Sequence, residues 1–400
     1  MQNNSRIGIT LATVAFLLIV ARGVQAQAEK VIYSFAGGSD GGSPNGVVID
    51  AKGNLYGTAA AGGSGSGTLF ELAPNGNGTW TETVLHTFSS DGIDGVRPDS
   101  GLVFDSSGNL YGTTSAGGQY GLGTIYELSP GSNGTSTEQI LYSFGGNTDA
   151  VPLGGGALAI DGSGNLYGSS DPGGAYGFGT VFELIRGSNG TWKEAILHSF
   201  SGDNDGSQPE SDTLILDHAG NVYGMANGGG PHDYGLIFEL SPESNGTWTE
   251  KTVHAFAGSS DGGGPIGGVI FNASGDLFGA AYSAFELTPG SNGIWTKKAL
   301  YTFTGGSDGA YPSAPLVFDK AGNLYGTTDY GGNHHGTVFE LSPNSNGTWT
   351  ERVLHRFSTT AGDGYYPQIA PLVMDAKGNL YGTTGFGGAS GAGVVYEVKP

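Results

Sequence analysis

Short runs of alternating apolar and polar residues recur along most of the chain, and each run is bounded by a turn rich in glycine or asparagine. In the run TVFEL at 337–341, Val338 and Glu340 fall on one face, and the three residues between and around them fall on the other. After the first 28 residues no stretch sustains a 3.6-residue period, so we predict no helices. The pattern therefore predicts an all-β chain.

One phrase, GNLYGT or a close variant, occurs seven times. Its copies begin at Gly53, Gly108, Gly164, Gly220, Gly275, Gly322 and Gly378, with steps of 55, 56, 56, 55, 47 and 56 residues. Self-similarity at a fixed period of this length indicates a closed ring or a stacked array of repeated units.

Each unit contains four strand-like runs separated by turn signals. Typical examples are 101–105 for the first run, 109–114 for the second, 124–130 for the third and 351–357 for the fourth. Four antiparallel strands in each of seven units predict a seven-bladed β-propeller, spanning residues 29–400.

The last unit reaches only its third run, at 394–398, while a run of the fourth type, KVIYSF, stands at 30–35. We therefore expect the N-terminal strand to complete the last blade and close the ring. An open solenoid would instead need capping repeats.

Aromatic residues recur at three positions of the unit, which favours a packing role. The first set is Tyr56, Tyr111, Tyr167, Tyr223, Phe278, Tyr325 and Tyr381, and the second is Phe70, Tyr126, Phe182, Phe238, Phe285, Phe339 and Tyr396. The five tryptophans, Trp80, Trp192, Trp248, Trp295 and Trp349, share the third position, in a hairpin similar to the Asp-box of other propellers.

The first residues are typical of a secretory signal peptide. Arg6 precedes an apolar run at 7–20, and small residues follow around Ala26 and Ala28. We therefore divide the chain into a signal peptide, 1–28, and the propeller, 29–400, and expect secretion or periplasmic release without a membrane span in the mature chain. The 15 Lys and Arg against 36 Asp and Glu give a net charge of −21, which argues against nucleic acid as a partner.

The repeat unit, VLHSFsG..DG..P...L..D..GNLYGTT..GG..G.GTVFEL.P, resembles the bacterial extracellular GloVer tandem repeat of choice-of-anchor proteins. The resemblance covers residues 30–400. The resemblance implies a location outside the cytoplasm, but it does not imply any particular enzymatic activity.

Two classes of function stay open: a non-enzymatic binding or scaffold propeller that recognises polysaccharide or a cell-envelope partner, and a carbohydrate-active hydrolase or lyase. The mature chain has few arginines for a sialidase site, and GSGSG at 63–67 lacks the strand–turn–helix setting of a nucleophile elbow. Half of the histidines share one outer-strand position with tyrosines, which indicates packing: His86, His198, His254 and His355 alternate there with Tyr33, Tyr142 and Tyr301. A catalytic carboxylate pair would have to be placed by geometry.

A ring of seven carboxylates is expected on the loop face, from the repeated motif F-x-G-x-x-D-G-x-x-P: Asp40, Asp94, Asp149, Asp205, Asp261, Asp308 and Asp363. An aspartate before glycine commonly caps its own turn. The alternative is Ca²⁺ binding at Asp203 and Asp205, although a full EF-hand loop is lacking. No other cofactor is expected.

The 47-residue step marks the one interruption of the repeat, where the fifth unit loses its glycine-rich loop. We expect a depression there, surrounded by the least repeat-like side chains: His232, Asp233, Tyr234, Tyr282, Tyr330, Asn333, His334 and His335. Aromatic and amide groups suit a sugar, whereas three histidines near Asp233 suit a transition metal.

Overall fold

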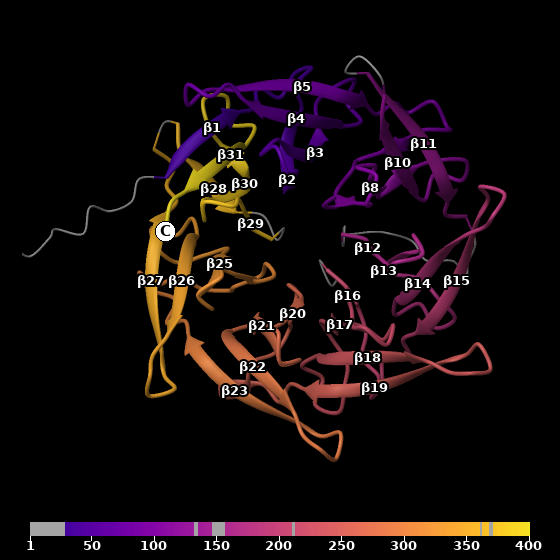
Figure 1. The fold of residues 1–400 in the computed structure, drawn as a ribbon, viewed down its shortest axis with the longest axis vertical. Coiled ribbons are helices and arrows are strands. Elements are labelled where there is room, and N and C mark those ends of the chain that lie inside the picture. The colour runs from indigo at the N-terminus through magenta and orange to yellow at the C-terminus, as the bar shows by residue number, and fades with distance from the viewer. Residues whose placement is uncertain (1–28, 132–134, 146–156, 210–212, 361, 368–370) are drawn as a thin grey trace, which may run out of the picture.

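The computed structural model describes residues 29–400, except 132–134, 146–156, 210–212, 361 and 368–370. Seven antiparallel sheets stand around a central axis as the blades of a propeller (Figure 1). The predicted fold class is confirmed. The predicted signal peptide lies outside the described residues.

The two strands nearest the axis in each blade come from the first two runs of the repeat. The innermost strands are β2 (Gly42–Ile49), β7 (Val103–Phe104), β12 (Ala159–Ile160), β16 (Ile215–Leu216), β20 (Val269–Phe271), β24 (Val317–Phe318) and β29 (Val373–Met374). The second strands are β3 (Leu55–Ala61), β8 (Leu110–Thr114), β13 (Leu166–Ser170), β17 (Val222–Ala226), β21 (Leu277–Ala281), β25 (Leu324–Thr328) and β30 (Leu380–Gly387).

The third and fourth runs form the outer half of each blade. The third strands are β4 (Thr68–Pro74), β10 (Thr124–Pro130), β14 (Thr180–Arg186), β18 (Leu236–Pro242), β22 (Ser283–Pro289), β26 (Thr337–Pro343) and β31 (Val394–Val398). The outer strands are β5 (Trp80–Thr87), β11 (Ser136–Ser143), β15 (Trp192–Ser199), β19 (Trp248–Ala255), β23 (Trp295–Thr302), β27 (Trp349–Arg356) and β1 (Lys30–Ser34).

A few short elements lie in the loops. β6 (Gly95–Val96) pairs with β9 (Ala116–Gly117), and β28 (Gly364–Pro367) pairs with β30. The one helical element in the described part of the chain is a 3₁₀ turn, η2 (Ser259–Asp261), so the prediction that the propeller has no regular helices holds there.

The ring is closed by its first strand. β1 pairs antiparallel with β31, with Lys30 opposite Glu397 and Ser34 opposite Val394. In Figure 1 the indigo β1 accordingly lies beside the yellow β31. The seventh blade therefore joins both ends of the propeller, as the sequence predicted.

The recurring aromatic residues fill the contacts between blades. All seven aromatic residues of the third strands are fully buried, as in Phe70 and Tyr396 at 0% exposure. Each of three tryptophans meets a second-strand ring of the preceding blade; Trp80, for instance, packs edge-to-face on Tyr381 with 5.8 Å between ring centroids. These contacts support the predicted packing role, and apolar burial of this kind dominates the stability of a repeat ring.

Candidate functional site

On the face that carries the glycine-rich loops, one residue of each described D-G-x-x-P loop has a left-handed backbone conformation. In the D-G-x-x-P loops, the residue before proline has a positive φ in all six described copies: Ser43 (50°), Arg97 (59°), Gln208 (53°), Gly264 (59°), Tyr311 (55°) and Tyr366 (55°). Glycine adopts this conformation at little cost, but only one of the six described loops has a glycine at this position. A residue with a side chain costs about 1–3 kcal/mol there, which points to a use for the side chain.

A depression lies where the fifth blade lacks its glycine-rich loop. A single residue, Tyr282, connects β21 to β22 there, with φ 63°. The cavity has a volume of about 370 Å³, and its lining includes Tyr282, Tyr311, Tyr330, Ser313, Asp329 and Asn227. The missing loop thus leaves a hollow at the position that the 47-residue step indicated.

Asp329 is the acidic group of this cavity. Its Oδ1 accepts a hydrogen bond from Ser313 Oγ at 2.6 Å. Burial raises the pKa of Asp329 to about 6, and the bond from Ser313 offsets only part of this effect. Among the described residues that line the cavity it is the only carboxyl group.

A row of aromatic side chains leads from the cavity across the sixth and seventh blades. We call Tyr282, Tyr311, Tyr330, Tyr366 and Phe386 the aromatic row. Successive ring centroids are 5.6, 5.8, 5.6 and 6.3 Å apart, each pair in edge-to-face contact. Four of the five side chains are about half exposed, from 48% for Phe386 to 55% for Tyr282.

The eight residues predicted for the site do not all meet. Tyr282 and Tyr330 line the cavity. His335 lies further along, with its ring centroid 5.9 Å from that of Tyr366. The other five are exposed and absent from the cavity lining: His232, Asp233, Tyr234, Asn333 and His334.

Three members of the aromatic row were missed by the sequence reasoning. Tyr311 and Tyr366 stand before proline in the D-G-x-x-P loop, of which only the aspartate was considered. Phe386 lies in the seventh glycine-rich segment, TTGFGG. The usable signal was the pair of tyrosines at a position that holds serine, arginine, glutamine or glycine in other blades.

Six of the seven predicted loop carboxylates are described, and each contacts the His or Tyr of the preceding outer strand; Asp149 lies outside the described residues. Asp205 accepts hydrogen bonds from the backbone N–H of Ser201 at 3.0 Å and from Ser201 Oγ, and it lies 3.2 Å from His198 Nε2. Asp203 is exposed. The turn interpretation accounts for the contacts of Asp205, and Ca²⁺ binding at this pair stays a prediction.

The same aspartates take part in a repeated contact between neighbouring outer strands, which we call a seam. The structure describes six seams in full, since Asp149 lies outside the described residues. Each of the six combines three residues: the His or Tyr of one outer strand, the Asp of the loop that follows it, and the residue four places before the equivalent His or Tyr in the next outer strand. A β-bulge precedes the His or Tyr in every outer strand, as between Val338 and Phe339 opposite β27, and bulges re-aim side chains.

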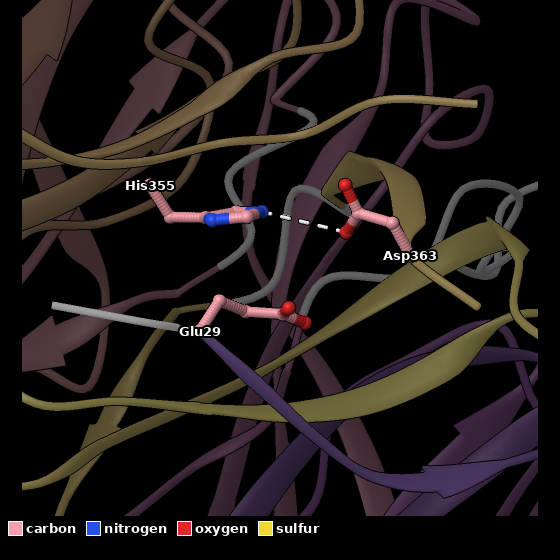
Figure 2. A group of neighbouring side chains, drawn as sticks. All are labelled: Glu29, His355 and Asp363. Atoms are coloured by element: carbon pink, nitrogen blue, oxygen red, sulfur yellow. Dashed lines mark hydrogen bonds and ion pairs between the residues drawn. The ribbon is translucent and has the colours of Figure 1, made fainter. Parts of the chain in front are cut away.

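Figure 2 shows one seam, between the sixth and seventh blades. His355 Nε2 lies 3.4 Å from Asp363 Oδ1, and Glu29, immediately before β1, extends its carboxyl group toward them. A second seam joins His86 and Asp94, 3.1 Å apart, to Glu138 of β11. In both seams burial raises the pKa of the glutamate to about 7.

The chain belongs to the Gloeobacter/Verrucomicrobia repeat family, whose matches cover residues 20–162, 134–290 and 283–400. No curated protein matches it. The family and the ring of blades define a repeat propeller.

Among solved structures, an ancestral GH74 enzyme aligns over 93% of this chain and 48% of its own, with 14% identity and a TM-score of 0.56. The extracellular domain of a one-component system from B. thetaiotaomicron aligns over 92% of this chain and 39% of its own, with 12% identity and a TM-score of 0.53. The chain thus spans less than half the length of either protein, and the likeness is one of fold. Within the described residues, no helix has the length and apolar character needed to cross a bilayer.

Proposed function

We propose that this protein is a secreted binding propeller that holds a polysaccharide along the aromatic row. The observation that carries the proposal is the continuity of that row, with five rings in edge-to-face contact across three blades. Tyrosine combines an apolar ring face with a polar hydroxyl, so half-exposed tyrosines suit a ligand with both apolar and hydroxyl faces. Loops on a rigid scaffold are a common place for such a site.

The strained backbone supports a role for these side chains. Tyr311 and Tyr366 occupy the left-handed position that Gly264 fills in the fourth-to-fifth loop. A tyrosine there destabilises the fold relative to glycine, and such strain concentrates at binding sites. The two tyrosines are therefore better explained by contact with a ligand than by the needs of the turn.

The cavity gives the row a defined end. Its volume of about 370 Å³ lies within the usual range for a small-molecule site. Asn227, Ser313 and Asp329 place amide, hydroxyl and carboxyl groups beside three tyrosines. These groups would orient one sugar unit while the row holds its neighbours.

A hydrolase or lyase is the second candidate, because Asp329 has the raised pKa, about 6, that is typical of a general acid. Glycosidases, however, generally use two carboxyl groups about 5–10 Å apart. The described lining of the cavity supplies only Asp329. Binding is therefore the better-supported function.

A glycan array followed by affinity electrophoresis on the hits would test binding. Tyr311→Gly with Tyr366→Gly copies the residue that the fourth-to-fifth loop already has, so folding should be unchanged while affinity falls at least tenfold, about 1.4 kcal/mol. Tyr120→Ala with Tyr176→Ala removes two exposed tyrosines of other blades and serves as the matched control. Equal affinity in the glycine variant would show that the row does not bind the ligand.

Two further measurements distinguish the remaining alternatives. Replacing Tyr234, His334 and His335 with alanine tests whether the ligand extends to the other predicted residues. Product analysis of the same polysaccharides tests for catalysis, and product that disappears in Asp329→Asn would replace the binding function with an enzymatic one.

The proposed secretion of the protein can be tested separately from ligand binding. Cleavage after Ala26 or Ala28 should release the propeller, and mass spectrometry of the secreted or periplasmic protein would identify the new N-terminus. An intact N-terminus in the membrane fraction would contradict secretion.

A further inference from the structure

Among the described residues, most seams contain an Asp and a Glu that form no ion pair with a lysine or arginine. Five of the six described seams carry a glutamate: Glu29, Glu82, Glu138, Glu250 and Glu351. In all five, Oε1 is buried and has no hydrogen-bond partner among the described residues. An unpaired buried carboxyl oxygen costs free energy, so these positions call for a partner.

The seam between the fourth and fifth blades has a lysine at the glutamate position. Lys297 Nζ lies 2.8 Å from Asp261 Oδ1 and also donates to the Asp261 carbonyl oxygen. Its side chain is only 9% exposed, and Nζ lies 4.8 Å from the centroid of the Phe256 ring. A positive charge is therefore accommodated at this place in the fold, close to the Asp and beside His254.

Three seams contain a His, an Asp and a Glu, but the ligand atoms of His198, Asp205 and Glu250 are not all within 4.8 Å of one another, whereas those of the other two sets are. His86, Asp94 and Glu138 form one set, and Glu29, His355 and Asp363 form the other; within each set the ligand atoms lie within 4.8 Å of one another. Tetrahedral zinc with bonds of about 2 Å places its ligand atoms about 3.3 Å apart. The separations of 3.1 and 3.4 Å between His and Asp already match that spacing.

From these observations we infer that the two seams each bind a divalent transition-metal ion, with Zn²⁺ as the natural probe, through one imidazole and two carboxylates. Imidazole selects zinc and its neighbours over calcium and magnesium, and three protein ligands leave a fourth position for water. The ion takes the place that the Lys297 ammonium occupies in the fourth-to-fifth seam. This inference does not depend on the aromatic row.

The site at Glu29 has a structural consequence. Glu29 adjoins β1, the strand that closes the ring, whereas His355 and Asp363 belong to the sixth blade and the loop after it. A metal ion there would tie the closing strand to its neighbour in a chain that has no cysteine. A ligand that binds the folded state alone stabilises it, so metal should resist opening of the ring.

Isothermal titration of the chelator-treated protein with Zn²⁺, followed by metal analysis, would test the inference. Two equivalents should bind, and Tm should rise on binding. His86→Tyr and His355→Tyr should each remove one equivalent, and together both. Tyrosine occupies this position naturally in three seams, at Tyr33, Tyr142 and Tyr301, so folding should be retained and can be checked by Tm in chelator.

Two controls make the result specific. His254→Tyr changes the same position in the lysine seam, and His334→Ala removes an exposed loop histidine. Neither should alter the stoichiometry. Failure to bind zinc, or undiminished binding in the double variant, would overturn the inference.

A gain of binding completes the test. Lys297→Glu gives the fourth-to-fifth seam, where Lys297 Nζ already reaches Asp261, the same His, Asp and Glu as the two inferred sites, so a third equivalent is expected, together with a larger Zn²⁺-dependent rise in Tm. A folded Lys297→Glu protein that binds only two equivalents would contradict the claim that the lysine stands in for the ion.

Discussion

The two seams on either side of the fifth blade use the same positions with opposite charges. On the side of the fourth blade, Lys297 lies against Asp261 at 2.8 Å. On the side of the sixth blade, Glu351 faces Asp308, whose Oδ2 accepts a hydrogen bond from Tyr301 at 3.0 Å. The repeat preserves the place of an ionisable group in each seam but not the sign of its charge.

This difference changes how the two seams respond to pH. Burial acts to raise the pKa of Asp261, but its hydrogen bonds, led by that from Lys297, lower it overall. Burial, reinforced by Asp308, raises the pKa of Glu351 to about 7, and Arg356 offsets part of the effect. The carboxylate of the lysine seam thus has a cation in direct contact, whereas Arg356 compensates the charge of the glutamate seam only in part, and protonation of Glu351 removes the rest.

Opening the ring should have the largest effect, because both seams depend on a closed propeller. Deleting residues 29–36 removes β1 and the fully buried Phe35. Loss of one buried phenylalanine alone costs about 3–5 kcal/mol, so we expect a loss of more than about 5 kcal/mol or of cooperative unfolding. Urea denaturation followed by circular dichroism measures it. A deletion variant as stable as the intact propeller would contradict closure by β1.

The next largest effect should come from the lysine itself. Lys297→Ala leaves Asp261 without its charge partner, and breaking a buried ion pair costs about 3–5 kcal/mol. Because the Asp261 side chain is 29% exposed, we expect the lower end, about 3 kcal/mol, in urea denaturation at pH 7.

Lys298→Ala is the adjacent control. Lys298 is 51% exposed and lies 3.7 Å from Glu286, so its loss should cost less than about 0.5 kcal/mol. Equal losses in the two variants would mean that Lys297 has no special role in its seam.

The sequence allowed the fold to be predicted because each strand and turn recurs in every blade. The candidate site was predicted only in part: the 47-residue step indicated the hollow beside Tyr282, but Tyr311, which lines the same cavity, was not among the predicted residues. The seams could not be predicted, since Lys297 and Asp261 are 36 residues apart in neighbouring blades. Interchange of His and Tyr at one position indicated packing, and only the structure shows that both side chains contact the aspartate of the loop that follows them, as His86 contacts Asp94 and Tyr301 contacts Asp308.

Asp329 gives a third test, because it is a buried carboxyl group beside the fifth and sixth blades that forms no ion pair with any described residue. Burial raises the pKa of Asp329 to about 6 in the folded state, so the folded state holds this proton more tightly than the unfolded chain does. The stability from this group is therefore fully present below the pKa of the unfolded chain and is lost as pH rises through 6. Asp329→Asn should therefore be more stable than the parent by about 2 kcal/mol at pH 8 and similar to it near pH 4. Asp233→Asn, at an exposed loop position, is the control and should show no such difference. A pH-independent effect of Asp329→Asn would rule out ionisation as its cause.

The smallest expected effect isolates the glutamate seam. Because the pKa of Glu351 is raised from 4.5 to about 7, the folded state holds its proton more tightly than the unfolded chain does. Stability from this group is therefore present below about pH 4.5 and is lost as pH rises through 7. The side chain is only partly buried, so solvent screening limits the effect to about 1 kcal/mol. Urea denaturation of Glu351→Gln in chelator should show the variant more stable than the parent at pH 8 and equal to it at pH 4.5, while Glu243→Gln, at an exposed hairpin, should follow the parent throughout.

Lys297→Ala should lose stability at pH 8, the pH at which Glu351→Gln gains it, because the lysine partners an ionised carboxylate and the glutamate opposes one. If both substitutions shifted stability in the same direction at pH 8, the two seams would share one electrostatic balance, and the contrast across the fifth blade would lie in packing alone.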